Sequence, residues 1–389
     1  MYNILKPKML FVFVVLALFS CEEDNETPSL RAKFDYATLT PLTPYTSTFV
    51  DASGSTTVNL FEGNTRYIMF YAINNYMTSR ISANEQIEAI KLKNMFSNTG
   101  SPFDDISTGS VLVDGEVLNT SGVQLRNVVA FSKPATQAEA ERAALKSNFE
   151  QIEEASNHIL ETASAGQAGK LGTRLVDAKG IELAQVIQKS LIGALQLDYI
   201  GNVLMEEGLN ADNTRVVGDK NYTELEHNWD IAYGLLTLNP VYLEGSTDGS
   251  RGTFEFGAGS YIWEYNKGSY ADIHPAFLKG RAAIVNNDHS TLQEQATFIR
   301  TEIEKTVANA ALGYLGKWKT DQTEADRAHH IGEGLGFIYS LRFATIHEAD
   351  AAFSDDIIEN LVGAPNGFWD IDADKINAAS EAISTKFGL

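Results

Sequence analysis

The chain has 389 residues, of which 44% are hydrophobic and 21% are charged. This composition is typical of a globular protein and excludes disorder over most of the length. The 51 acidic residues outnumber the 30 Lys and Arg residues and give a formal net charge of −21. Because phosphate backbones repel such a chain, we expect no nucleic-acid partner, and the like charge favours a monomer. The single cysteine, Cys21, excludes an internal disulfide framework and a multi-cysteine metal site.

The N-terminus has the layout of a secretory signal peptide over residues 1–20. Lys6 and Lys8 precede an apolar run over residues 9–20, which is too short to span a bilayer. Residues 18–21 (LFSC) resemble the lipobox of bacterial lipoproteins. This resemblance implies that Cys21 is lipidated and attaches the mature chain to a membrane.

The residues after Cys21 indicate which membrane would hold the lipid anchor. Glu22 stands where inner-membrane lipoproteins have aspartate, so the resemblance implies an outer-membrane lipoprotein. The acidic run 22–24 is similar to export signals of lipoproteins exposed at the cell surface. Residues 21–33 are polar and contain a proline, which predicts a flexible lipidated tether.

Residues 34–389 predict an all-α body with short extended segments near its start. Thr, Ser and Pro with alternating apolar positions predict extended segments or a strand pair within 34–62. Helical spacing then predicts helices over 65–80 and 87–95, followed by a long loop over 97–122. Further helices are predicted over 135–163, 177–201, 222–238, 274–286, 289–316, 321–347, 350–361 and 372–386. Such helices bury their apolar stripes most simply as bundles, so we expect two packed halves, 34–202 and 203–389.

The segment 245–270 differs from the rest because it holds six glycines and six aromatic residues without a helical period. A long connection of this kind predicts a functional loop. Its aromatic rings, with Tyr261, Trp263 and Tyr265 at the centre, can either stack on a sugar or anchor the loop to the bundle.

The histidines carry the clearest chemical pattern. Four of the seven have an acidic residue three positions later, more than the acid content predicts by chance. On a helix this spacing puts an imidazole and a carboxylate on one face, and bundle proteins assemble metal sites from such faces. The same spacing also produces surface ion pairs, and the alanine-rich surroundings of His158 and Glu161 favour that interpretation there.

Two of these pairs, His227 with Asp230 and His330 with Glu333, have similar neighbours and suggest a weak internal duplication. Each half would then offer one imidazole and one carboxylate across a pseudo-twofold axis. His329 also reaches Glu333 at i,i+4 and competes with His330 as a ligand. This nitrogen and oxygen donor set predicts one iron or zinc ion. A buried polar network that fixes the packing of the helices explains the same residues equally well.

Common catalytic motifs such as GxSxG, HExxH and the Walker loop are absent from the sequence. The glycines of residues 332–336 (GEGLG) fall inside a helical pattern and follow no strand. We therefore predict that they permit close helix packing and do not bind a dinucleotide.

With these motifs in view, the chain resembles an uncharacterised family of Gram-negative lipoproteins, a domain of unknown function related to the imelysin-like proteins. The resemblance rests on Cys21 and on residues 226–234 (EHNWDIAYG) and 328–341 (AHHIGEGLGFIYSL). It implies an imelysin-like arrangement of two helical-bundle halves, a role in iron uptake and a GxHxxE motif proposed to bind a peptidase metal. His330 and Glu333 match HxxE, whereas Ala328 replaces the glycine, which argues against carrying over the peptidase role.

The leading hypothesis is a non-catalytic, lipid-anchored cell-envelope protein that binds a metal or a metal-bearing ligand in iron uptake, with an outer-membrane uptake receptor as a partner. One alternative is a zinc peptidase that uses the same histidines and carboxylates. Another is a surface glycan-binding lipoprotein that uses the aromatic segment 245–270.

Overall fold

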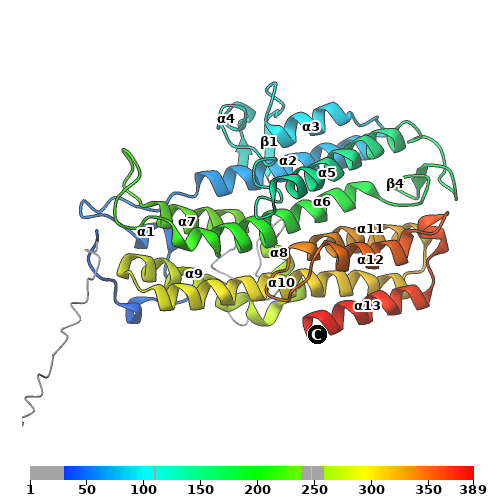
Figure 1. Cartoon of the computed structure of the whole chain (residues 1–389). Helices are drawn as coiled ribbons and strands as arrows, with labels where there is room; N and C mark the ends of the chain where they lie inside the picture. Colours follow the sequence, from blue (N-terminus) through cyan, green and yellow to red (C-terminus); the bar gives the residue numbers. More distant parts are fainter. Residues whose placement is uncertain (1–29, 109–110, 238–246, 248–257) are drawn as a thin grey trace, which may run out of the picture.

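The computed structural model describes residues 30–108, 111–237, 247 and 258–389 (Figure 1). The predicted signal peptide, the lipidation residue Cys21 and most of the predicted tether lie outside the described residues. The same holds for residues 245–246 and 248–257 of the aromatic segment.

The described residues form thirteen α-helices and two short antiparallel hairpins. The first helices are α1 (Tyr45–Thr48), α2 (Phe61–Ala83), α3 (Ala89–Ser97), α4 (Gly115–Asn119), α5 (Ala135–Ser156) and α6 (Leu183–Gly193). The later helices are α7 (Glu224–Leu236), α8 (Ala258–Tyr265), α9 (Lys267–Asn286), α10 (His289–Thr320), α11 (Glu324–Ser340), α12 (Ala351–Val362) and α13 (Ala373–Phe387). One hairpin pairs β1 (Ile106–Thr108) with β2 (Val111–Val113), and the other pairs β3 (Gly169–Leu171) with β4 (Arg174–Val176). A π-helix (Ala194–Leu204) continues α6, and 3-10 turns cover Tyr36–Thr38, Glu207–Asn210, Leu341–Phe343 and Gly367–Asp370.

The helices form two layers that run along a common long axis (Figure 1). One layer contains α2, α3, α5 and α6, and the other contains α9 to α13. The layers meet where α6 packs on α11, and α7 from the later part of the chain packs on α2. Within the part of the chain that the structure describes, no helix is long and apolar enough to cross a membrane.

The longest helix, α10, is the centre of the second layer and contacts α8, α9, α11 and α13. The side chain of Asp288 caps its start by accepting a hydrogen bond of 3.0 Å from the backbone N–H of Thr291. Ile299, Ile303 and Val307 repeat at one helical turn and are at most 1% exposed. Burial of each such side chain contributes about 1.5–3 kcal/mol, so this stripe secures the axis on which the other helices pack.

The all-α class is confirmed, and each region predicted as a helix contains one. Of the extended segments or strand pair predicted within 34–62, the described backbone forms no paired strands: it has one antiparallel bridge, between Val50 and Thr56, beside short helical turns. The hairpins lie later in the chain. One of them, together with α4, falls inside the loop predicted over 97–122.

Two helix boundaries differ from the prediction for tertiary reasons. The helix predicted over 321–347 ends at Ser340 because Arg342 turns away to pair with Glu141 at 2.9 Å and with Asp355 at 2.5 Å. The loop predicted over 245–270 is wrong from Ala258 onward, where α8 begins. In α8 the rings of Tyr261 and Tyr265 stack at the i,i+4 spacing of a helix.

Candidate functional site

The first half of α11 is held close to α6 by the glycines that the sequence analysis assigned to helix packing. A Cβ at Gly332 would lie 3.0 Å from the carbonyl oxygen of Glu182, and one at Gly336 would lie 2.6 Å from Cβ of Lys189. The helix packing predicted for these glycines is therefore confirmed. The close approach brings the side chain of Glu182 against His329 and that of Lys189 against Glu333.

His329 lies between two carboxylates. Its Nδ1 is 2.7 Å from Oε2 of Glu182, and its Nε2 is 3.5 Å from Oε2 of Glu333. The Glu182 side chain is 5% exposed and the His329 side chain is 16% exposed. The imidazole is therefore nearer to solvent than the acid that it contacts.

His330 points to a different acid. Its Nδ1 is 2.6 Å from Oδ2 of Asp321, the residue that follows α10. The rings of His329 and His330 are 5.4 Å apart, and the Tyr314 ring lies 5.8 Å from that of His330. Nδ1 of each imidazole thus faces a carboxylate, and Nε2 of His329 faces a second one, that of Glu333. Among the described residues, Nε2 of His330 has no hydrogen-bond partner.

Glu333 completes this group, which we call the His329 cluster: Glu182, Lys189, Asp321, His329, His330 and Glu333. The carboxylate of Glu333 lies 2.9 Å from the Lys189 ammonium, which is almost fully buried. Burial lowers the pKa of Lys189, and the charge of Glu333 opposes that shift. The cluster therefore contains three carboxylates, one buried cation and two oriented imidazoles at its exposed edge.

Asp230, at the other predicted half-site, belongs to a second charged group. This Arg281 cluster contains Arg31, Tyr45, Thr57, Glu226, Asp230 and Arg281. The Arg281 guanidinium is fully buried and donates to Asp230 at 3.1 Å, to Glu226 at 2.9 Å and to Thr57 at 3.0 Å. Asp230 also accepts hydrogen bonds from the Tyr45 hydroxyl and from a backbone N–H. Both oxygens of Asp230 are thus occupied by protein donors.

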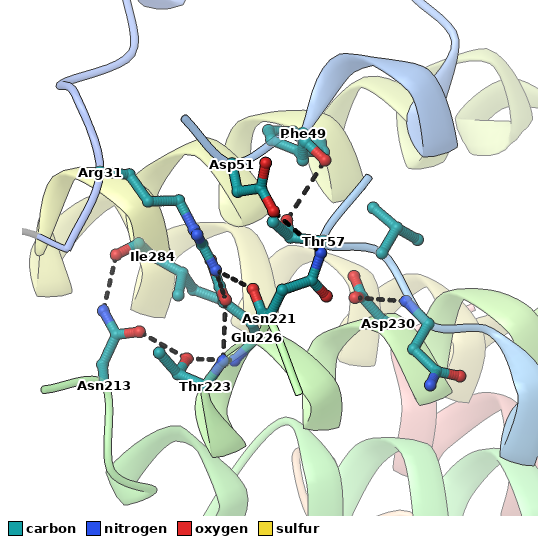
Figure 2. Close-up of polar contacts among 12 residues, drawn as sticks. Arg31, Phe49, Asp51, Thr57, Asn213, Asn221, Thr223, Glu226, Asp230 and Ile284 are labelled. Carbon is teal, nitrogen blue, oxygen red and sulfur yellow. Dashed lines mark hydrogen bonds and ion pairs between the residues drawn. The ribbon is translucent and has the colours of Figure 1, made fainter. Parts of the chain in front are cut away.

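Figure 2 shows how the start of the chain joins this cluster. Arg31 reaches Glu226 through two hydrogen bonds and donates a third to the carbonyl oxygen of Asn221 at 2.7 Å. Glu226 and Thr223 form a capping box at the start of α7. Burial raises the pKa of Glu226, but Arg31 and Arg281 more than offset it, so this pKa lies below its usual value. Arg31 lies within the predicted tether and yet packs on the body.

His227 does not contact Asp230 through the predicted pairing. Its Nε2 lies 3.5 Å from Oε1 of Glu62 on α2, and its ring stacks on Tyr222 at 4.6 Å. Nδ1 of His227 is buried without a hydrogen-bond partner. The α7 and α11 helices lie toward opposite ends of the molecule (Figure 1). The structure therefore brings His329, His330 and Glu333 together, but places His227 and Asp230 among other partners.

The predicted surface pair is confirmed, since Nδ1 of His158 lies 3.0 Å from Glu161 at an exposed position. The aromatic residues of α8 face inward. Trp263 is 5% exposed and packs edge-on against Tyr270, while the Tyr261 ring packs against Phe337 of α11. These rings join α8 to the bundle, as one of the two interpretations of the segment expected.

Across the residues that the structure describes, no group of three or more His, Cys, Asp and Glu side chains has an arrangement that could hold a metal ion as it stands. In the His329 cluster the acids and imidazoles bond directly to each other. Chemically, the cluster offers two imidazoles that carboxylates orient through Nδ1.

Sequence spacing does not identify Glu182, Lys189, Asp321 or Arg281. Glu182 lies 147 positions before His329, and Arg281 lies 51 positions after Asp230. In the sequence each of them is a charged residue within or beside a predicted apolar helix. Many surface residues have the same description.

The fold and the two clusters define an all-α protein with charged groups buried between packed helices. The chain belongs to the family described as domain of unknown function (DUF4856), whose model matches residues 44–389. No curated protein and no solved structure matches the chain.

Proposed function

We propose that this protein is a lipid-anchored, non-catalytic protein of the cell envelope that binds a metal ion or a metal-bearing ligand in iron uptake. His329 and His330 would supply the ligands. The observation that carries the proposal is that a carboxylate holds Nδ1 of each imidazole, at 2.7 Å and 2.6 Å. Metal-binding histidines usually donate their second N–H to such a carboxylate, which orients the ring and makes the ligand nitrogen more basic.

Glu333 is the third candidate ligand of this site. Its carboxylate lies 3.5 Å from Nε2 of His329, although Lys189 now pairs with it. A bound cation would compete with the Lys189 ammonium for this carboxylate. Two imidazoles and a carboxylate suit either iron or zinc, so the donor set supports both.

The metal test is elemental analysis of residues 22–389 purified without chelator or affinity metal, then incubated with Fe²⁺ or Zn²⁺. We expect near-stoichiometric metal in the parent and its loss in the His329→Ala/His330→Ala variant. The matched control is His227→Ala, whose imidazole lies beside Glu62. Equal metal in the parent and the double variant, or no metal in either, would refute the proposed site. Loss of metal in the His227→Ala control would instead favour the four-residue set predicted from the sequence.

We propose that Cys21 carries the lipid anchor and that the protein is attached to the outer membrane. Exposure on the outer face of that membrane is a further part of the proposal. In an expressing Gram-negative host we expect labelled palmitate to attach to the wild-type chain and not to Cys21→Ala. The wild-type chain should sediment with outer membranes while the variant is released. Sedimentation of the Cys21→Ala variant with the membrane would contradict the anchor.

We further propose that the two layers correspond to the two bundle halves of an imelysin-like arrangement, 34–202 and 203–389. The packing of α6 on α11 supports this assignment. We expect a monomer, which size-exclusion chromatography with light scattering tests directly, and an outer-membrane uptake receptor as the partner.

A further inference from the structure

A cavity of about 720 Å³ lies beside the π-helix, and none of its lining residues belongs to the His329 cluster. Its walls come from α2, the turn at residues 127–131, the π-helix, the 3-10 turn at residues 207–210 and the start of α7. Small-molecule sites usually have volumes of roughly 300–1,000 Å³. The size of the cavity therefore suits a small organic ligand.

Arg66 is the buried charged residue of this cavity. Its side chain is 8% exposed, and Nη1 pairs with Oε2 of Glu62 at 3.0 Å. Nε of Arg66 is buried and has no hydrogen-bond partner. An unpaired buried donor costs about 1–3 kcal/mol, so this edge of the guanidinium calls for an acceptor. The planar edge formed by Nε and Nη2 matches a carboxylate, which accepts two parallel hydrogen bonds.

The opposite charge lines the outer part of the cavity. Glu207 and Glu224 are exposed there, and neither makes an ion pair with any residue that the structure describes. Asp212 is a third carboxylate of the lining and pairs with Arg215 at 2.9 Å. The lining thus combines a buried guanidinium with exposed acids. A ligand with a carboxylate and an ammonium would satisfy both kinds of group, whereas the acids would repel a simple anion.

The rest of the lining is partly apolar. Val128, Val203 and Leu204 line the cavity, and the Arg66 guanidinium lies 5.1 Å from the centre of the Tyr199 ring. Tyr199, Val203 and Leu204 all belong to the π-helix. Such widened helical turns are rare and lie frequently at functional sites. This wall fits the apolar side chain of a ligand.

We propose that the cavity binds a small zwitterion: an α-amino acid, or a short peptide, with an apolar side chain. Its carboxylate bonds to Arg66, and its ammonium faces Glu207 and Glu224. The site is separate from the proposed metal site, so either can fail without the other.

The test is calorimetric titration of the full mature chain with L-leucine and with alanyl-leucyl-alanine, which distinguish an amino acid from a peptide. Leucinamide lacks the carboxylate and N-acetyl-leucine lacks the ammonium. We expect one or both zwitterions to bind, and each analogue to bind at least tenfold more weakly than leucine or the peptide. Absence of binding by both zwitterions, or equal affinity for leucinamide, would overturn the proposal.

Two variants locate the site. Arg66→Gln should weaken zwitterion binding at least tenfold and abolish the preference over leucinamide. Because Arg66 is buried and its variant can misfold, the exposed pair Glu207→Gln/Glu224→Gln provides a second test. That pair should weaken zwitterion binding and reduce the preference over N-acetyl-leucine, whereas Glu381→Gln on α13 should change neither. Zwitterion binding unchanged in a folded Arg66→Gln, or in the double variant, would place binding elsewhere and overturn the proposal.

Discussion

The Arg281 and His329 clusters each contain the acid of a predicted histidine and acid pair, Asp230 in one and Glu333 in the other, but they differ in burial and in how fully their polar atoms are paired. In the Arg281 cluster the guanidinium and both Asp230 oxygens are bonded to protein groups, and the charged side chains of Asp230 and Arg281 are 0% exposed. In the His329 cluster the His329 and His330 side chains are 16% and 20% exposed. The spacing of a histidine and an acid along a helix therefore does not by itself separate a structural network from a binding site.

The largest expected effect tests whether the Arg281 cluster is structural. Arg281→Met leaves two buried carboxylates, Glu226 and Asp230, without their shared cation. We expect the free energy of unfolding to fall by about 3–5 kcal/mol, measured by urea denaturation. The His329→Ala/His330→Ala variant should lose less, because both imidazoles are partly exposed to water.

The control for this prediction is Arg80→Met, which breaks the exposed ion pair between Arg80 and Glu85. A surface pair contributes only about 0–1 kcal/mol. If Arg281→Met destabilises the protein no more than Arg80→Met does, the cluster does not secure the fold.

A smaller effect is expected from the glycine that places Arg281. A Cβ at Gly280 would overlap the indole ring of Trp229, which is 1% exposed on α7. Gly280→Ala should therefore push α9 away from α7 and lower the free energy of unfolding by about 1–3 kcal/mol. Gly268 lies on the same helix with no atom near the position of a Cβ, so Gly268→Ala should cause no loss. Equal denaturation midpoints for the two variants would show that this contact does not limit the packing.

The smallest effect concerns acid stability near His227. Hydrogen bonding from His227, together with Arg66, lowers the pKa of Glu62 from 4.5 to about 2 despite its partial burial. Because the folded pKa is the lower one, its contribution is complete above pH 4.5 and disappears as the pH falls toward 2. The Glu62 side chain is 37% exposed, so solvent screening limits this contribution to less than about 1 kcal/mol.

The measurement is the melting temperature of the parent and of Glu62→Gln at pH 7 and pH 3. Glu62→Gln should lower the melting temperature at pH 7 and have less effect at pH 3. Glu381→Gln, an exposed change on α13, serves as the control. A Glu62→Gln effect as large at pH 3 as at pH 7 would contradict the assigned role of the charge.

Most helices could be predicted from the sequence because their apolar residues repeat at helical spacing, as Ile299, Ile303 and Val307 do in α10. The role of the α11 glycines could also be predicted, since they fall within that pattern. The stop at Ser340 could not be predicted, because it depends on Arg342 finding Glu141 on another helix. The spacing of His329, His330 and Glu333 within one helix could be predicted, whereas the partners Glu182 and Asp321 come from other elements and could not.

By itself the sequence determined the all-α class, the places of the helices and the close packing at the α11 glycines, because these follow from local periodicity and side-chain size. Only the tertiary structure decided which acid each imidazole meets. It joined His227 to Glu62 and His329 to Glu182, and it buried Asp230 against Arg281. Those pairings depend on which helix faces pack together, and the spacing of charged residues within one helix does not encode that.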